Sequence, residues 1–146
     1  MAYLTKSDMF SFDKKHFNLE KLQRGRVGTT LGNADFLAEQ SGIPRSKFIE
    51  IATLSQLVSL LLKDRIDVLV FERISVMSLL QAQTDRDIYY QTIGDVPASI
   101  AVSNDNEGDE LKEKLDQLIM QLNQDKIFAD YLKYSRMPDS GTVPRK

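Results

Sequence analysis

Short strand-like segments alternate with helical segments along most of the chain. Each strand-like segment is rich in β-branched or aromatic residues and is bounded by Gly, Pro, Asn or Asp; the segments are 26–30, 48–51, 66–71, 87–93 and 99–103. Apolar residues at helical spacing lie between them, over 33–40, 54–63 and 74–83. Strands that alternate with helices of about ten residues are typical of βαβ units. We therefore predict an α/β fold with a mostly parallel sheet and helices on both of its faces.

The chain changes character from residue 107 onward. The strand predicted over 99–103 is expected to lead into two C-terminal helices, the first carrying a leucine stripe at residues 111, 115, 118 and 122 and the second covering 125–134. Pro and Gly then predict a flexible tail over 136–146. We accordingly divide the chain into an α/β body over 1–98, a segment over 99–135 that contains this strand and the C-terminal helices, and the tail.

Composition excludes several kinds of chemistry. The chain of 146 residues has no Cys and a single histidine, His16, so disulfides and thiolate metal sites are excluded and zinc ligation is disfavoured. His16 lies in a charged segment, where a solvated loop histidine is expected. A formal net charge of −2 offers no basic surface for nucleic acid. We predict no metal site, no cofactor and no nucleic-acid partner.

The chain shows neither a membrane span nor an export signal. No stretch approaches the roughly 18 apolar residues that a transmembrane helix needs. The first residues lack the basic start and apolar region of a secretory signal. We therefore expect no export signal in these residues.

A glycine-containing turn follows the first predicted strand and opens a helix. The turn reads Thr30-Leu31-Gly32-Asn33, and Asn33 is expected to be the N-cap of the helix. Unpaired backbone N–H groups and the positive end of the helix dipole favour an anion at such a position. The glycines do not fit G-x-G-x-x-G, and no Gly-Lys-Ser/Thr follows. The alternative is that the turn is only structural.

Glu72 directly follows the apolar strand over 66–71. In open α/β sheets, ligands bind outside the carboxyl ends of the strands, so we expect Glu72 to lie near the turn at Gly32. Its carboxylate is then placed to receive an ammonium group while the helix start receives a carboxylate. The alternative is that Glu72 and Arg73 simply begin the next helix, where an acidic residue is favourable.

Charged residues elsewhere are balanced in sign, which favours a solvated surface. The basic residues Arg24, Arg26, Arg45 and Lys47 are matched by the acidic residues Glu20, Asp35, Glu39 and Glu50.

The order of these motifs resembles the later part of the periplasmic solute-binding proteins of the amino-acid type, namely extracellular solute-binding family 3, which has the type II periplasmic binding fold. The similar stretches are 19–28, Gly32, 62–72, 99–105 and the C-terminal helix pair, within residues 17–134. The resemblance implies the second of two α/β lobes that close on a small ligand. It also implies that the strand over 99–103 is the crossover strand of that fold. It also implies service in ABC uptake or sensing, a periplasmic location, an ABC permease as partner and no enzymatic activity.

The resemblance also implies which residues bind the ligand. These are Thr30, Leu31, Gly32, Asn33 and Glu72, with Glu72 at a position where amino-acid binders usually have Asp. The ligand is expected to be a small polar or zwitterionic solute. The opening half of the first lobe, with its arginine clamp, does not appear in the sequence, so the chain is expected to carry at most half of a binding cleft.

The leucine stripe of the C-terminal helices requires a cover, because large exposed apolar patches are uncommon on soluble monomers. We expect these helices either to fold back on the α/β body or to exchange with a second copy. Exchange through a hinge at 96–99 would give a homodimer.

Two other classes of function remain open. One is an enzyme on the same fold, such as a dehydratase or the regulatory lobe of a peptidoglycan-cleaving enzyme, with Glu72 as the candidate general acid or base. The other is a stand-alone α/β protein-interaction domain. A phospho-receiver is disfavoured because Asp67 stands at the beginning of its strand rather than at the end.

Overall fold

The structure is a computed structural model that describes residues 2–5, 25–83, 86–95 and 99–144. The chain divides into two compact units. Unit 1 contains the described residues up to 95 and those from 138 onward, and unit 2 contains those from 99 to 137. Each unit is described by itself.

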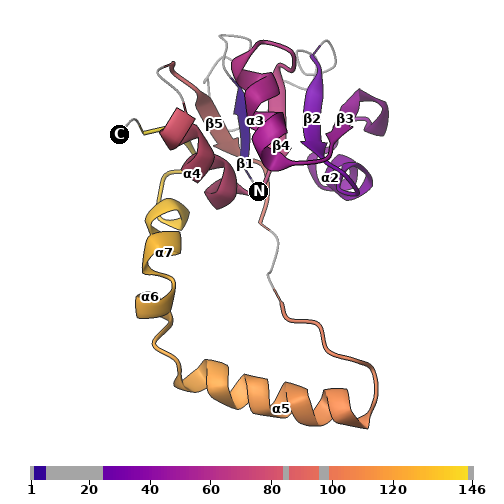
Figure 1. The fold of residues 1–146 in the computed structure, drawn as a ribbon, viewed down its shortest axis with the longest axis vertical. Helices are drawn as coiled ribbons and strands as arrows, with labels where there is room; N and C mark the ends of the chain where they lie inside the picture. The colour runs from indigo at the N-terminus through magenta and orange to yellow at the C-terminus, as the bar shows by residue number, and fades with distance from the viewer. Residues whose placement is uncertain (1, 6–24, 84–85, 96–98, 145–146) are drawn as a thin grey trace. The chain divides into compact units, whose positions relative to one another are not determined.

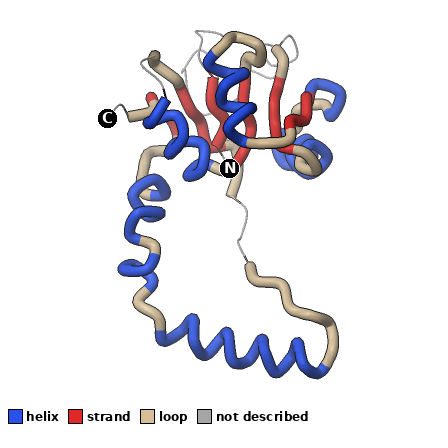
Figure 2. The backbone as a smooth tube through the Cα atoms, viewed as in Figure 1, coloured by secondary structure: helices blue, strands red, loops and turns tan. Residues whose placement is uncertain are grey.

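Unit 1 is built on one sheet with the strand order β3-β2-β4-β1-β5-β6 (Figures 1 and 2). The strands are β1 (Ala2–Thr5), β2 (Val27–Thr30), β3 (Phe48–Ile51), β4 (Val68–Phe71), β5 (Tyr89–Thr92) and β6 (Ser140–Thr142). β2 pairs in parallel with β3 and β4. β1 pairs antiparallel with β4 and β5, and β6 pairs antiparallel with β5. The α/β class is therefore confirmed, but the sheet is mixed rather than mostly parallel.

The mixed pairing arises from two strands that local pattern did not indicate. β1 is a four-residue segment near the start of the chain, and it inserts between β4 and β5. β6 comes from the far end of the chain. The expected crossover strand over 99–103 does not form, since these residues have no strand structure. Ser103 instead supports the start of the next helix, where its hydroxyl donates to Asp105 Oδ1 at 2.9 Å.

Helices cover both faces of the sheet, as predicted. The helical segments of unit 1 are α2 (Ala34–Ser41), the 3-10 helix η1 (Arg45–Lys47), α3 (Leu54–Leu62) and α4 (Arg73–Gln83). Successive side chains of a strand point to opposite faces. Val27 belongs to a core cluster with Ala34 and Leu37 of α2. A Cβ on Gly28 would lie 2.6 Å from Leu57 Cδ1, so α3 packs closely on the other face.

The start of α3 is a local feature that the sequence predicts well. The pattern Thr53-Leu-Ser-Gln56 is typical of a capping box. In the structure Thr53 is the N-cap, and its Oγ1 accepts a hydrogen bond from the Gln56 N–H at 3.3 Å.

The segment from 138 to 144 joins the sheet and is not the flexible tail that its Pro and Gly content predicts. The Thr92 N–H donates to Asp139 O at 2.6 Å, and the Val143 N–H donates to Ile88 O at 2.8 Å. Gly141 lies opposite Tyr90, and a Cβ there would approach Tyr90 Oη to 3.2 Å. The glycine therefore provides room for the buried tyrosine ring.

Unit 2 consists of α5 (Asn106–Gln121), α6 (Gln124–Ile127) and α7 (Ala129–Ser135). The helix predicted over 125–134 is thus divided at Phe128. Gly108 is the only buried residue of α5. Several apolar side chains of the unit are exposed: Leu111, Leu118, Ile119, Met120, Leu122, Ile127, Phe128 and Tyr131. Among the described helices, none has the length and apolar character needed to cross a membrane.

Candidate functional site

The turn at Gly32 and Glu72 follow two neighbouring strands at the same edge of the sheet. β2 and β4 run parallel, with Val27 opposite Val68 and Gly28 opposite Leu69. Each strand continues two residues beyond the second pair, to Thr30 and Phe71. The carboxyl ends of β2 and β4 therefore bring together the predicted ligand residues. We call this set the carboxyl-edge site: Thr30, Leu31, Gly32, Asn33 and Glu72.

The turn after β2 has a defined conformation. Gly32 has φ +80°, a left-handed conformation that favours glycine, and nothing lies within 4 Å of the position of a Cβ. The Leu31 N–H donates to Ile51 O at 3.1 Å, which ties the turn to β3. The Leu31 side chain is 61% exposed. The turn thus presents an apolar side chain to solvent at the edge of the sheet.

Asn33 occupies the N-cap position of α2 without capping it through its side chain. Its Nδ2 donates instead to Thr30 Oγ1 at 2.8 Å and to Leu31 O at 3.3 Å. The expectation that the Asn33 side chain caps the helix is therefore wrong. The amide turns back into the loop, because a different side chain satisfies the N–H groups at the start of α2.

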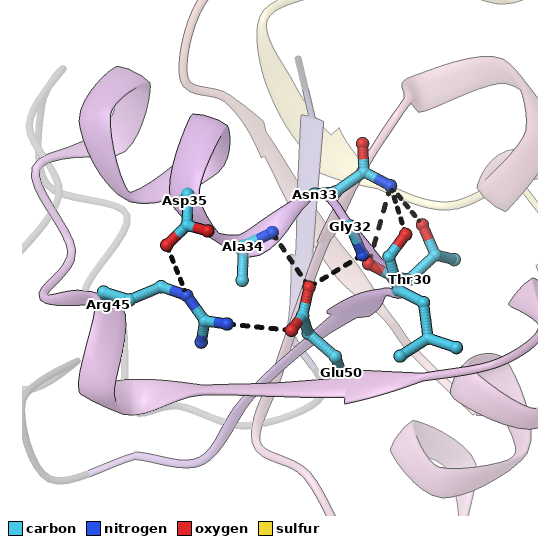
Figure 3. A network of polar contacts seen from close by, with 8 residues as sticks. Thr30, Gly32, Asn33, Ala34, Asp35, Arg45 and Glu50 are labelled. Atoms are coloured by element: carbon cyan, nitrogen blue, oxygen red, sulfur yellow. Dashed lines mark hydrogen bonds and ion pairs between the residues drawn. The ribbon is translucent and has the colours of Figure 1, made fainter.

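That side chain is Glu50 of β3, as Figure 3 shows. Its Oε1 accepts hydrogen bonds from the Gly32 N–H at 2.9 Å and from the Ala34 N–H at 3.3 Å. The sequence predicted an anion at this helix start, and the structure places an internal carboxylate there. The Glu50 side chain is 23% exposed, so this anion is partly removed from water.

Arg45 of η1 holds the other oxygen of Glu50 (Figure 3). Its Nη2 donates to Glu50 Oε2 at 2.8 Å, and its Nε donates to Asp35 Oδ1 at 2.8 Å. The sequence analysis places Arg45, Asp35 and Glu50 among the balanced charges of a solvated surface and does not predict this network. The signal that was available is a lone carboxylate in the apolar strand Phe48–Ile51, on the same strand face as Phe48.

Glu72 directly precedes α4 and accepts hydrogen bonds from the first turn of that helix. Oε1 accepts from the Ile74 N–H at 2.7 Å, and Oε2 accepts from the Ser75 N–H at 2.8 Å. These two contacts agree with the alternative role given to Glu72 in the sequence analysis, in which it stands at the start of the next helix. A carboxylate has about four lone-pair sites, so each oxygen retains the capacity to accept a further donor.

The amino ends of β2 and β4, opposite the carboxyl-edge site, carry a different charged contact. Arg26 precedes β2 and Asp67 precedes β4, and the Arg26 Nε lies 3.1 Å from Asp67 Oδ2. The carboxylate of Asp67 raises the pKa of the Arg26 guanidinium through this hydrogen bond and its charge. Asp67 therefore lies away from the carboxyl-edge site.

The described residues hold no group of three or more His, Asp or Glu side chains that could bind a metal ion. His16, interpreted from the sequence as a loop histidine, lies outside the described residues.

Comparison of the chain with known protein families, with curated proteins and with solved structures found no match.

Proposed function

We propose that unit 1 is one lobe of a two-lobed solute-binding protein with the type II periplasmic binding fold, and that it binds a small polar ligand at the carboxyl-edge site. The function served would be ABC uptake or sensing, at a periplasmic location and with a permease as partner. The observation that carries this proposal is the register of β2 and β4, which puts the Gly32 turn and Glu72 after neighbouring parallel strands.

The chemistry of the edge supports recognition of an ammonium group. The Glu72 carboxylate is fixed by two backbone N–H groups of α4 and retains lone pairs for a ligand donor. Hydrogen bonds between a carboxylate and an ammonium group are stronger than those between neutral groups. Leu31 adds an exposed apolar contact beside it.

A single sheet edge does not enclose a ligand. Small-molecule sites typically bury 70–90% of the surface of a drug-sized ligand. The proposal therefore assigns the remaining contacts to a second lobe and predicts weak binding to this chain alone. Weak binding requires a method that detects fast exchange at individual residues.

The experiment is a series of ¹H–¹⁵N correlation spectra of the full chain during titration with amino acids, polyamines and monocarboxylates. At least one class with an amino group is expected to shift the amide signals of Gly32, Ala34, Ile74 and Ser75. The proposal fails if no class moves these four signals, or if the shifts lie on other parts of unit 1.

A matched pair of variants tests the role assigned to Glu72. Glu72→Gln retains an oxygen that can accept from α4 but removes the negative charge, so the amine-dependent shifts are expected to disappear. Glu39→Gln removes one charge from the exposed surface of α2 and is expected to leave the shifts unchanged.

A further inference from the structure

We propose that Glu50 is an internal occupant of the anion position at the start of α2 and restricts the carboxyl-edge site to ligands recognised through an amine, without a carboxylate at this turn. This inference rests on the proposed function, and it makes Glu50 a specificity-determining residue of the same site.

The first step is an account of the backbone donors at the turn. The Gly32 and Ala34 N–H groups both donate to Glu50 Oε1. The Asn33 N–H between them donates to Thr30 O at 3.2 Å. All three consecutive N–H groups therefore have acceptors within the chain. A ligand carboxylate at this turn has to displace one of those acceptors.

The second step is the strength with which Glu50 is held. Its backbone is fixed in β3, with Glu50 opposite Thr29 of β2. Arg45 holds Oε2 at 2.8 Å, so both carboxylate oxygens have charge-assisted or backbone donors. A group tethered in the correct geometry has a high effective concentration relative to a free molecule of the same chemistry. A free carboxylate in solution therefore competes poorly with Glu50.

The third step is the charge that a ligand meets. The polar network at the turn contains two carboxylates, Glu50 and Asp35, and one guanidinium, Arg45. Glu72 adds a third carboxylate after the neighbouring strand. The next residue is Arg73, whose Nη2 lies 3.7 Å from Asp139 Oδ1 and whose guanidinium lies over the ring of Tyr90. The excess of carboxylates attracts ammonium groups and repels a ligand carboxylate.

The test replaces the internal carboxylate by a free one. The full chain and its Glu50→Ala variant are titrated with sodium acetate at constant ionic strength, and the amide signals of Gly32 and Ala34 are followed. The unaltered chain is expected to show no shift of these signals. Glu50→Ala is expected to show a saturable shift at both amides and a rise in melting temperature with acetate, because acetate enters the vacated position.

Two variants separate occupancy from charge. Glu50→Gln places an amide oxygen near the same N–H groups, so it is expected to remain unresponsive to acetate. Glu39→Ala removes a carboxylate from α2 without opening the turn and is also expected to remain unresponsive. If Glu50→Ala is unfolded in buffer, acetate is expected to restore a dispersed spectrum.

Three results overturn the inference. The first is an acetate-dependent shift of Gly32 and Ala34 in the unaltered chain. The second is a Glu50→Ala variant that acetate neither shifts nor refolds. The third is a response of Glu50→Gln equal to that of Glu50→Ala.

A separate arm distinguishes this inference from the proposed function. The unaltered chain is titrated with 1,4-diaminobutane and with glycine. If neither moves the Ile74 and Ser75 amides, the proposed function fails while the acetate result still decides whether Glu50 occupies the anion position. If glycine, which carries a carboxylate, binds more tightly than the diamine, the exclusion of a ligand carboxylate is overturned while the ligand site itself stands.

Discussion

The hydroxyl of Thr29 is buried in β2, opposite Glu50, with no hydrogen-bond partner among the described residues. A buried polar group without a partner costs about 1–3 kcal/mol. Thr29→Val has nearly the same shape and removes the hydroxyl, so we expect it to raise the free energy of unfolding by about 1 kcal/mol. The measurement is urea unfolding followed by circular dichroism.

Thr53→Val is the control for this substitution. It makes the same chemical change at the N-cap of α3, where the hydroxyl oxygen accepts from Gln56. Loss of this cap is expected to lower the free energy of unfolding by about 1 kcal/mol. A decrease in stability for Thr29→Val would show that its hydroxyl has a partner and would contradict the account of β2.

Asp105 gives the start of α5 a dependence on pH. Its pKa is lowered, first by the hydrogen bond from the Gly108 N–H and then by that from the Ser103 hydroxyl. A depressed pKa stabilises the folded helix start above the unfolded pKa of an aspartate, about 3.9, and this contribution is lost as the pH falls through the lower folded value. We expect the Gly108 amide shift to titrate with a midpoint below that of an unfolded aspartate.

Asp105→Asn is the matched variant for the pH titration. An asparagine oxygen retains an acceptor for the Gly108 N–H but does not titrate in this range. The Gly108 signal is therefore expected to show no inflection. A midpoint above about 3.9 in the unaltered chain would contradict the assignment of Asp105 as the cap.

At the scale of single residues, sequence predicted the contacts that are local and missed those that are not. Thr53 caps a residue three positions along, and a short pattern contains both partners. Glu50 reaches Gly32 across 18 positions through the pairing of β3 with β2. No spacing rule for helix caps includes a side chain from a neighbouring strand. The cap of α2 was therefore wrongly expected from Asn33.

The last strand depends on Tyr90. This side chain is 2% exposed, and its hydroxyl donates to Pro138 O at 3.0 Å. Tyr90→Phe removes the donor and leaves a carbonyl without it, so we expect a loss of about 1 kcal/mol in unfolding free energy. We also expect faster hydrogen exchange at the Val143 amide, which directly follows β6 and donates to Ile88 O.

Tyr131→Phe is the control for Tyr90→Phe, because Tyr131 is exposed in unit 2. It is expected to change neither stability nor exchange at Val143. Unchanged exchange at Val143 in Tyr90→Phe would mean that β6 is held by its backbone pairing alone.

At the scale of elements, four strands and three helices of unit 1 were predicted close to their observed bounds, because each contains its own periodic pattern. β1 and β6 were not predicted, since their pairing partners lie far away in the chain. The strand expected over 99–103 was wrong, because no strand among the described residues pairs with this short β-branched run. These misses explain why a mixed sheet was predicted to be mostly parallel.

The leucine stripe of α5 predicts self-association. Leu111, Leu115 and Leu118 follow the 4-3 spacing of a coiled-coil seam along α5, and Leu111 and Leu118 are exposed. Leu122, the fourth residue of the stripe, is the exposed C-cap of the helix, with an extended backbone. We expect sedimentation velocity to show a reversible homodimer whose population rises with concentration. Leu118→Glu is expected to give a monomer.

Met120→Glu is the control for the stripe, because Met120 is 81% exposed and lies off the seam. It is expected to dimerise like the unaltered chain. A concentration-independent monomer of the unaltered chain would contradict self-association through α5. The hinge proposed for exchange, residues 96–99, lies mostly outside the described residues.

At the scale of the whole molecule, the two compact units have different proposed roles, ligand binding for unit 1 and self-association for unit 2. Unit 1 carries the sheet edge with its polar network and Glu72, and unit 2 carries the exposed apolar helices. The α/β class and the position of the predicted ligand residues at one edge follow from strand order and parallel pairing. The role of Glu50 required the register of β3 with β2.

The central claim is that the turn after β2 and the end of β4 form one ligand site. The most direct measurement is a titration of the full chain with 1,4-diaminobutane in which the Gly32 and Ile74 amide shifts are fitted separately. The account predicts a single apparent Kd for both signals and the loss of both shifts in Glu72→Gln. Two different Kd values, movement of only one signal, or shifts that persist in Glu72→Gln would contradict it.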